Sequence, residues 1–345
     1  MKRIIFTALA SALCCTALQA QQHAEAIDSR TVEAHLSFLA SDALEGRRAG
    51  KQGGRVAAEY IRATLKEYGV KAFYDTYFQP FEAFSPPREK EIEYQVHPDS
   101  VAKYRQLPAY RKLSLQNVVG YIEGEKKDEY ILIGAHYDHL GIDEELTGDR
   151  IYNGADDNAS SLAALLQLAK VFAGQEAKPK RSILFAFWDG EEVNYLGSEY
   201  FAAHFGDIRS IRANINLDMI SREGLLPILY PEFSIPEATD SNTATGRQFH
   251  LVYTEELAGA GQRLQQSIRS EGLKVEAKLS VMAHGSTGSD YLPFTLRGVP
   301  ILWFFTGLHP DYHTPFDETD RIDIEKLVHI TRAIYLGLYS LAYED

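Results

Sequence analysis

The chain contains 345 residues, with 35 Lys and Arg side chains against 48 Asp and Glu, which gives a formal net charge of −13. This excess of negative charge argues against nucleic acids and anionic membrane surfaces as partners. The length is sufficient for one large α/β domain with an extensive buried core.

The first 20 residues are typical of a secretory signal peptide. Lys2 and Arg3 provide a positively charged start, and a mostly apolar run follows as far as Leu18. We therefore expect export, to the periplasm or to the outside of the cell. Both cysteines, Cys14 and Cys15, fall in this segment, so the exported protein would be stabilised by its core without disulfides. No other apolar run approaches the length of a membrane span, which argues against stable membrane insertion.

The pattern of apolar residues changes along the rest of the chain. Residues 29–70 show helical spacing, and residues 71–130 alternate as strands do. From residue 129 onward, buried strands alternate with amphipathic helices. We expect strands at 130–135, 183–188, 213–217 and 299–305, and helices at about 159–173, 195–204, 255–271 and 324–342.

This alternation predicts an α/β fold, with three layers (α/β/α), a mixed but largely parallel central sheet and a single catalytic domain. The segments 221–250 and 276–290 are rich in Pro, Gly, Ser and Thr. We expect both to be long surface loops at the rim of a functional site. The sequence carries no signal for an oligomeric state.

Potential metal ligands follow the predicted strands, where open α/β sheets bind ligands. They occur in five segments, which contain His136 and Asp138, Asp156 to Asn158, Glu191 and Glu192, Asp218, and Tyr312 and His313. Two imidazoles and three carboxylates suit two zinc ions that share one bridging carboxylate. An additional carboxylate beside a ligand, within the Glu191–Glu192 pair, is then free to move protons.

Each segment also has a simpler structural interpretation. Asp156–Asn158 could cap the helix that follows, and His313 could be a solvated loop residue. The constrained turn at Gly154 instead favours a held carboxylate, with unusual peptide geometry at Asp157–Asn158. Asp138 could accept the second ring N–H of His136. His139 and His309 are close enough in sequence to line the site but have no assigned role.

The joint order of these segments resembles the secreted di-zinc aminopeptidases of metallopeptidase family 28. The resemblance covers most of the chain, and no HExxH, Walker, GxSxG or CxxC motif competes with it. It is carried by the segments 38–47, 57–61, 134–141, 153–160, 187–192, 196–198, 216–219, 289–290 and 312–314.

The resemblance implies a role for each candidate residue. One zinc ion would be held by His136, Asp157 and Asp218, and the other by Asp157, Glu192 and His313. Asp138 would orient His136, Glu191 would act as the general base, and Tyr312 would stabilise the tetrahedral intermediate. Residues 21–345 would form the zinc peptidase domain, without the protease-associated domain that many relatives insert, because residues 90–115 are too short for one.

We therefore expect an aminopeptidase that acts on peptide or protein N-termini. Two enzymatic alternatives remain open: a glutaminyl cyclase-like transferase, which would use one zinc ion, and a carboxypeptidase-like enzyme, which would need a basic pocket for the terminal carboxylate. A non-enzymatic binding protein on the same scaffold is a third alternative, and loss of a ligand or of the base would favour it.

Overall fold

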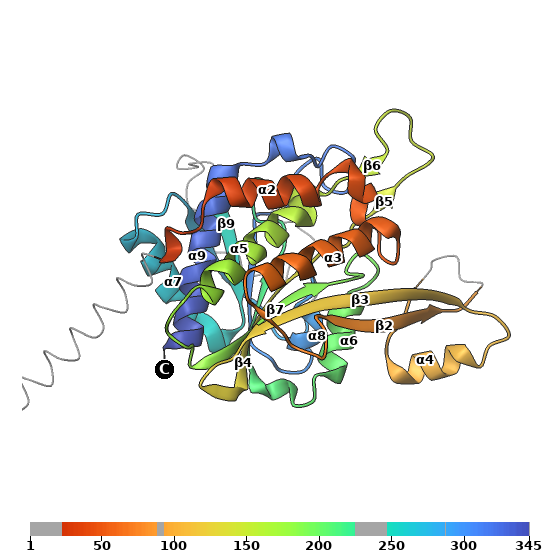
Figure 1. Ribbon diagram of the computed structural model, residues 1–345, viewed down its shortest axis with the longest axis horizontal. Helices are drawn as coiled ribbons and strands as arrows, with labels where there is room; N and C mark the ends of the chain where they lie inside the picture. The colour runs from red at the N-terminus through yellow and green to blue at the C-terminus, as the bar shows by residue number, and fades with distance from the viewer. Residues whose placement is uncertain (1–22, 88–92, 225–246, 287, 345) are drawn as a thin grey trace, which may run out of the picture.

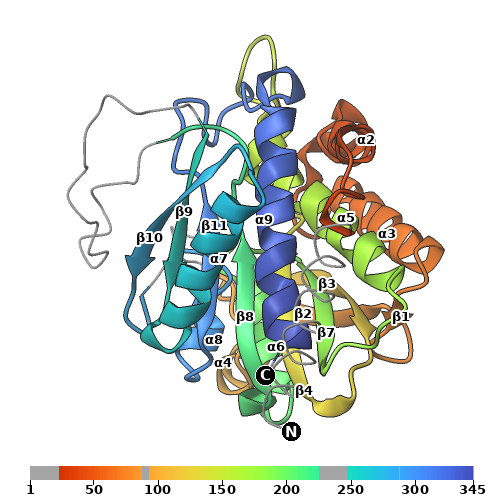
Figure 2. The same ribbon diagram turned by 90° about the vertical axis from the view of Figure 1, so that its left-hand side faces the viewer.

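Figure 1 shows a computed structural model of the chain, which describes residues 23–87, 93–224, 247–286 and 288–344. The predicted signal peptide, residues 1–20, lies outside these ranges. Within them, nine strands form one sheet with helices on both faces (Figure 2). None of the helices in the described ranges has both the length and the apolar character that a membrane span requires.

The centre of the sheet is parallel. Its strands are β7 (Arg181–Trp188), β4 (Lys126–His136), β8 (Ile211–Leu217) and β11 (Ile301–Phe305), in that spatial order. All four strands therefore end at the same edge, which is where the predicted ligands follow them in sequence. The predicted strands are confirmed, with ends that differ by a few residues.

Antiparallel strands extend the sheet on both sides. Next to β7 lies β3 (Arg111–Ile122), which pairs with β1 (Lys71–Ala72) and β2 (Phe78–Ser85). Next to β11 lies β9 (Gln248–Tyr253), which is antiparallel to β11 and parallel to the edge strand β10 (Glu276–Val281). The predicted mixed, largely parallel sheet is confirmed.

The prediction that 221–250 and 276–290 are loops is wrong for the residues that form β9 and β10. Residues 225–246 and 287 lie outside the described ranges. In β9, Phe249 and Leu251 alternate with neighbours on the other face and are fully buried in the main core. This alternation is a strand signal that the nearby turn residues obscured. The helix α4 (Pro98–Arg105) was also not expected, and it has no buried residues.

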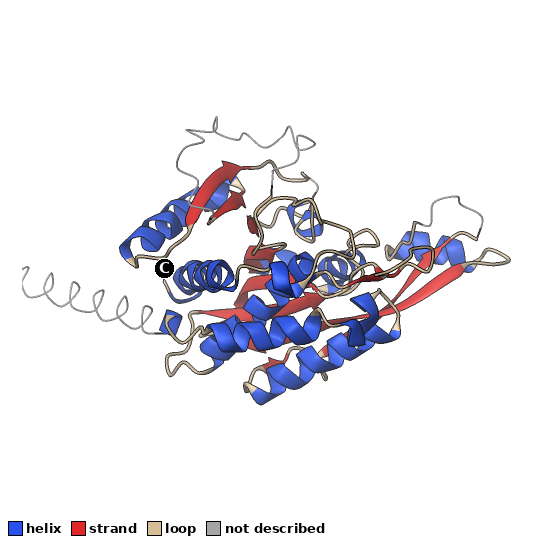
Figure 3. Cartoon of the chain, turned by 90° about the horizontal axis from the view of Figure 1, so that it is seen from above, coloured by secondary structure: helices blue, strands red, loops and turns tan. Residues whose placement is uncertain are grey.

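Two unequal helical layers cover the sheet (Figure 3). One face packs against α3 (Gln52–Glu67), α5 (Ser161–Ala173), α7 (Ala258–Ser270) and α9 (Ile324–Tyr343), and α2 (Ser29–Leu39) packs on α5 and α9. The other face packs against α6 (Leu196–His204) and α8 (Leu292–Thr295). In β7, Phe185 and Phe187 join the first core while Leu184 and Trp188 join the second, so both faces of this strand are buried.

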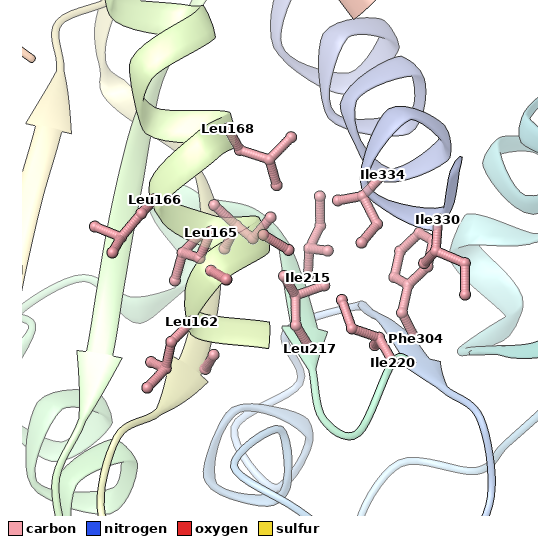
Figure 4. Packing of buried hydrophobic residues seen from close by; sticks show 14 of the residues in the cluster. Leu162, Leu165, Leu166, Leu168, Ile215, Leu217, Ile220, Phe304, Ile330 and Ile334 are labelled. Atoms are coloured by element: carbon pink, nitrogen blue, oxygen red, sulfur yellow. The ribbon is translucent and has the colours of Figure 1, made fainter. Parts of the chain in front are cut away.

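The core lies directly beneath the carboxyl edge of the sheet. Figure 4 shows Leu165 of α5 and Ile330 and Ile334 of α9 facing Ile215 and Phe304 of the central strands. Complete burial of each such side chain contributes about 1.5–3 kcal/mol. The strands that carry the candidate ligands are therefore held on a well-packed base.

Candidate metal centre

The five predicted ligands converge at the carboxyl edge of the parallel strands. His136 is the last residue of β4, and Asp218 directly follows β8. Glu192 follows β7, and His313 lies in the loop after β11. Asp157 lies within η2 (Ala155–Ser160), although its own backbone is not helical. The peptide bond between Asp157 and Asn158 is cis, which is unusual geometry of the kind predicted there.

Asp157 occupies the centre of this group. Its Oδ1 lies 3.2 Å from Nε2 of His136, and its Oδ2 lies 3.2 Å from Nε2 of His313. On the first side, Oδ1 of Asp218 is 3.6 Å from Nε2 of His136. On the second side, Oε2 of Glu192 is 3.2 Å from Nε2 of His313. The carboxylate of Asp157 thus presents one oxygen to each of two clusters of donor atoms.

The donor atoms fit divalent metal ions. One ligand atom each from His136, Glu191 and Asp218 lie within 4.8 Å of one another, as do one each from His136, Asp157 and Glu192. Nε2 of His313 is buried and has no hydrogen-bond partner, although two carboxylate oxygens approach it. Imidazole nitrogen combined with carboxylate oxygen is a typical donor set for zinc.

The buried carboxylates of the centre disfavour one another's ionisation, and a bound cation would offset this effect. Burial raises the pKa of Glu191 well above its usual range, and the neighbouring Glu192 adds to this effect. Burial would lower the pKa of His313, but Asp157 and Glu192 outweigh it and raise this pKa to about 10. Burial and His136 act in opposite directions on Asp218, whose pKa is raised. Divalent cations at this position would favour the ionised carboxylates.

Asp138 is buried behind the pair of glutamates. Its Oδ1 accepts a hydrogen bond from the backbone N–H of Glu191 at 3.0 Å, and its Oδ2 accepts one from that of Glu192 at 3.3 Å. Nδ1 of His136 instead lies 3.1 Å from the backbone carbonyl oxygen of Asp138 and 3.8 Å from Oδ1. The predicted contact between Asp138 and the second ring nitrogen of His136 is therefore made by the backbone carbonyl oxygen of Asp138, while its carboxylate accepts from two backbone amides.

Ser289 fixes the orientation of Asp218. The Ser289 hydroxyl donates to Oδ2 of Asp218 at 2.6 Å and accepts from the side-chain amide of Asn216 at 2.9 Å. Oδ1 of Asp218 is left facing His136. Ser289 belongs to one of the segments that carry the family resemblance, but the sequence predicts no role for it.

Asp317 holds the backbone at Asp157, and no sequence pattern predicted it. Its carboxylate accepts from the backbone N–H of Asp156, at 3.0 and 3.1 Å, and from that of Asp157, at 3.0 Å. A guanidinium nitrogen of Arg222 lies 3.6 Å from it. Asp317 follows His313 by four residues in a loop, and a carboxylate whose partners are distant backbone amides leaves no pattern in the sequence.

A small cavity with a volume of about 60 Å³ opens beside the centre. Polar residues of the centre form one wall, and the other walls are formed largely by apolar side chains; the lining residues are His136, Asp157, Glu191, Asp218, Met219, Gly288, Trp303, Phe305, Leu308 and Tyr312. Among the described residues that line it, none is Lys or Arg. Tyr312 stacks on His313 with the ring centroids 3.8 Å apart, so its ring lies at the boundary between the cavity and the second cluster.

The two histidines close enough in sequence to line the site, His139 and His309, both lie beside the centre. Nδ1 of His139 lies 2.7 Å from Oε1 of Glu192. Nε2 of His309 lies 3.6 Å from Oδ2 of Asp156, in the supporting network around Asp317. Both rings are buried.

Comparison with known proteins agrees with this arrangement. Residues 117–337 match the model of peptidase family M28. A glutamate carboxypeptidase 2 homolog from Caenorhabditis elegans is 26% identical over 252 residues, which are 68% of this chain and 31% of that protein. Aminopeptidase YwaD from Bacillus subtilis is 24% identical over 243 residues, which are 66% of this chain and 46% of that protein. The chain thus spans less than half the length of either relative.

Solved structures share the fold. An aminopeptidase from Aneurinibacillus sp. strain AM-1 superposes with a TM-score of 0.67 at 17% identity, covering 94% of this chain and 97% of that one. A glutaminyl cyclase from Porphyromonas gingivalis gives a TM-score of 0.63 at 16% identity, covering 91% and 99%. The same architecture therefore occurs in proteins named for different reactions.

Proposed function

Because this chain belongs to peptidase family M28, we propose that it is a zinc-dependent aminopeptidase that hydrolyses the first peptide bond of peptides or proteins. The observation that carries the proposal is the central carboxylate of Asp157, which offers one oxygen to His136 and the other to His313, each at 3.2 Å. A bridging carboxylate between two sets of N and O donors is suited to a pair of metal ions.

The ligands divide into two sets that share Asp157. His136, Asp157 and Asp218 would hold one zinc ion, and Asp157, Glu192 and His313 would hold the other. Zinc bound there would supply Lewis acidity, which lowers the pKa of a water toward 7 and polarises the scissile carbonyl.

Glu191 is placed to move protons. It lines the cavity, its Oε2 lies 4.0 Å from Nε2 of His136, and Asp138 holds its backbone N–H. We assign it as the general base that accepts a proton from the attacking water and then delivers it to the leaving amine. The hydroxyl of Tyr312, at the cavity wall, would donate a hydrogen bond to the developing oxyanion.

The charge of the cavity favours a substrate amine over a substrate carboxylate. Its described lining includes Asp157, Glu191 and Asp218 but no Lys or Arg. The buried Arg47 nearby donates to backbone carbonyl oxygens, including those of Tyr137 and Gly154, and so is already engaged. With zinc bound, the charges of Asp157 and Asp218 would be balanced by the metal ions, and Glu191 would remain as the carboxylate that a free α-amine could meet, whereas no described Lys or Arg would pair with a terminal carboxylate. This supports the aminopeptidase over the carboxypeptidase-like alternative.

The direct test replaces Glu191 with Gln and measures both hydrolysis of a panel of aminoacyl chromogenic substrates and zinc content. We expect at least about a 10²-fold loss of kcat with zinc content unchanged, because the base is removed and the ligands remain. N-acetylated versions of the same substrates serve as controls and should not be cleaved by the unaltered enzyme. Near-full hydrolysis by Glu191→Gln would refute the assignment of the base.

Because a glutaminyl cyclase shares this fold, cyclisation of an N-terminal glutamine is the second candidate reaction. That alternative predicts one zinc ion per chain and ring closure of an N-terminal glutamine with release of ammonia. Presented with a glutaminyl peptide, a hydrolase releases the free amino acid instead.

Export through a signal peptide at residues 1–20, and the absence of an inserted protease-associated domain, remain predictions.

A further inference from the structure

His139 is a buried histidine in contact with the centre that none of the roles above uses. It is 1% exposed, and its Nδ1 lies 2.7 Å from Oε1 of Glu192. The next carboxylate oxygen, Oδ2 of Asp157, lies 3.8 Å from the same nitrogen. The hydrogen bond to Glu192 is therefore the closest polar contact of this ring with the proposed ligands.

The surroundings of His139 hold its ring in place. A Cβ atom at Gly154 would lie only 2.5 Å from Cδ2 of the His139 ring, so the ring packs directly on the bare glycine backbone. The backbone N–H of His139 donates to the carbonyl oxygen of Arg47 at 3.2 Å. The guanidinium of Arg47 donates in turn to the carbonyl oxygens of Asn153, at 2.6 Å, and Gly154, at 3.0 Å. Arg47 thus holds both the backbone of His139 and the loop at Asn153 and Gly154 on which the ring packs.

The contact settles how Glu192 is oriented. Oε1 faces Nδ1 of His139, and Oε2 faces Nε2 of His313 at 3.2 Å. With one oxygen occupied by an N–H donor, the other is directed toward the position where the second metal ion would lie. Partners of this kind orient metal ligands, and their loss typically lowers metal affinity or activity by about 10–100-fold.

We propose that His139 is a positioning residue, which donates a hydrogen bond from Nδ1 to Glu192 and holds this carboxylate for the second metal ion. The inference rests on the proposed two-metal function but goes beyond it, because His139 is not among the ligands or the catalytic groups. It also gives the N-terminal segment around Arg47 a part in building the centre.

The test measures zinc affinity directly, by competition with a chromophoric chelator, for two substitutions at this position. His139→Leu removes the donor, and we expect the affinity of the second zinc ion to fall by about 10–100-fold while the first is retained. His139→Asn places a side-chain N–H near the position of Nδ1, and we expect it to recover most of this loss. His35→Leu serves as a matched control, because His35 is also buried but lies in α2, and its substitution should leave both affinities unchanged.

Thermal unfolding of the metal-free variants verifies that each is folded. The inference is overturned if the unaltered protein binds two zinc ions and His139→Leu binds both as tightly, or if His139→Asn is as impaired as His139→Leu. An unaltered protein that binds fewer than two zinc ions would contradict the proposed function itself, so the two failures are distinguishable.

Discussion

The carboxylate of Asp317 provides a quantitative test of how Asp157, the proposed bridging ligand, is held. We expect Asp317→Asn to destabilise the metal-free protein. One oxygen, Oδ2, accepts from the backbone N–H groups of both Asp156 and Asp157 at 3.0 Å. A hydrogen bond to a charged group contributes about 1.5–3 kcal/mol, and a buried donor left without a partner costs about 1–3 kcal/mol.

A second effect opposes this loss. Burial and the neighbouring Asp317 together raise the pKa of Asp156 to about 7, so neutralising Asp317 relieves some repulsion. Removing the charge also weakens the contact with Arg222. Because the asparagine side chain keeps one acceptor oxygen, we expect a net loss of about 2 kcal/mol in the free energy of unfolding.

Urea unfolding at pH 7 in the presence of a chelator measures this loss without a contribution from metal binding. Asp320→Asn is the control, because Asp320 is exposed and lies three residues further along the chain, in the short 3-10 helix η5 (Thr319–Arg321). The zinc affinity of Asp317→Asn should also be lower than that of the control. If both variants unfold at the same urea concentration as the unaltered protein, Asp317 does not support Asp157 in the way described.

Three further outcomes are expected. Burial lowers the pKa of His35 to about 4, so below pH 6.5 the unfolded chain binds a proton at this ring that the folded chain does not. As the pH falls from 6.5 to 4, the free energy of unfolding should therefore decrease by up to about 3 kcal/mol. The urea midpoint of His35→Gln should depend less on pH than that of the unaltered protein. Gly154→Ala would place Cβ 2.1 Å from the carbonyl oxygen of Asp157 at a φ of +57°, so zinc binding measured by dialysis should be lost, and normal binding would contradict the geometry. Ser289→Ala frees Oδ2 of Asp218 and should lower zinc affinity by about 10–100-fold, whereas an unchanged affinity would show that the hydroxyl is dispensable.

The centre of the sheet was predictable because a strand that is buried on both faces, such as β7, is continuously apolar over most of its length. In β7, Ile183 to Trp188 contribute alternately to two cores, and no polar position interrupts the run. Ligands placed directly after such strands converge by topology alone, since parallel strands end at one edge. This is why His136 and Asp218 could be brought together from the sequence.

The remaining features depend on contacts that no local pattern encodes. Strands β9 and β10 lie at one side of the sheet, and their alternation is short and surrounded by turn residues. Asp317 and Asp138 accept hydrogen bonds from backbone amides, which every residue type except proline carries. The contact between His139 and Glu192 joins residues 53 positions apart and depends on the space left by Gly154.

The number of zinc ions bound per chain tests the central claim most directly. Elemental analysis of purified protein, saturated with zinc and then dialysed, should give two ions per chain, because Asp157 presents an oxygen to each of two donor sets. A value of one, or no retained zinc, would contradict a centre in which this carboxylate bridges a metal pair.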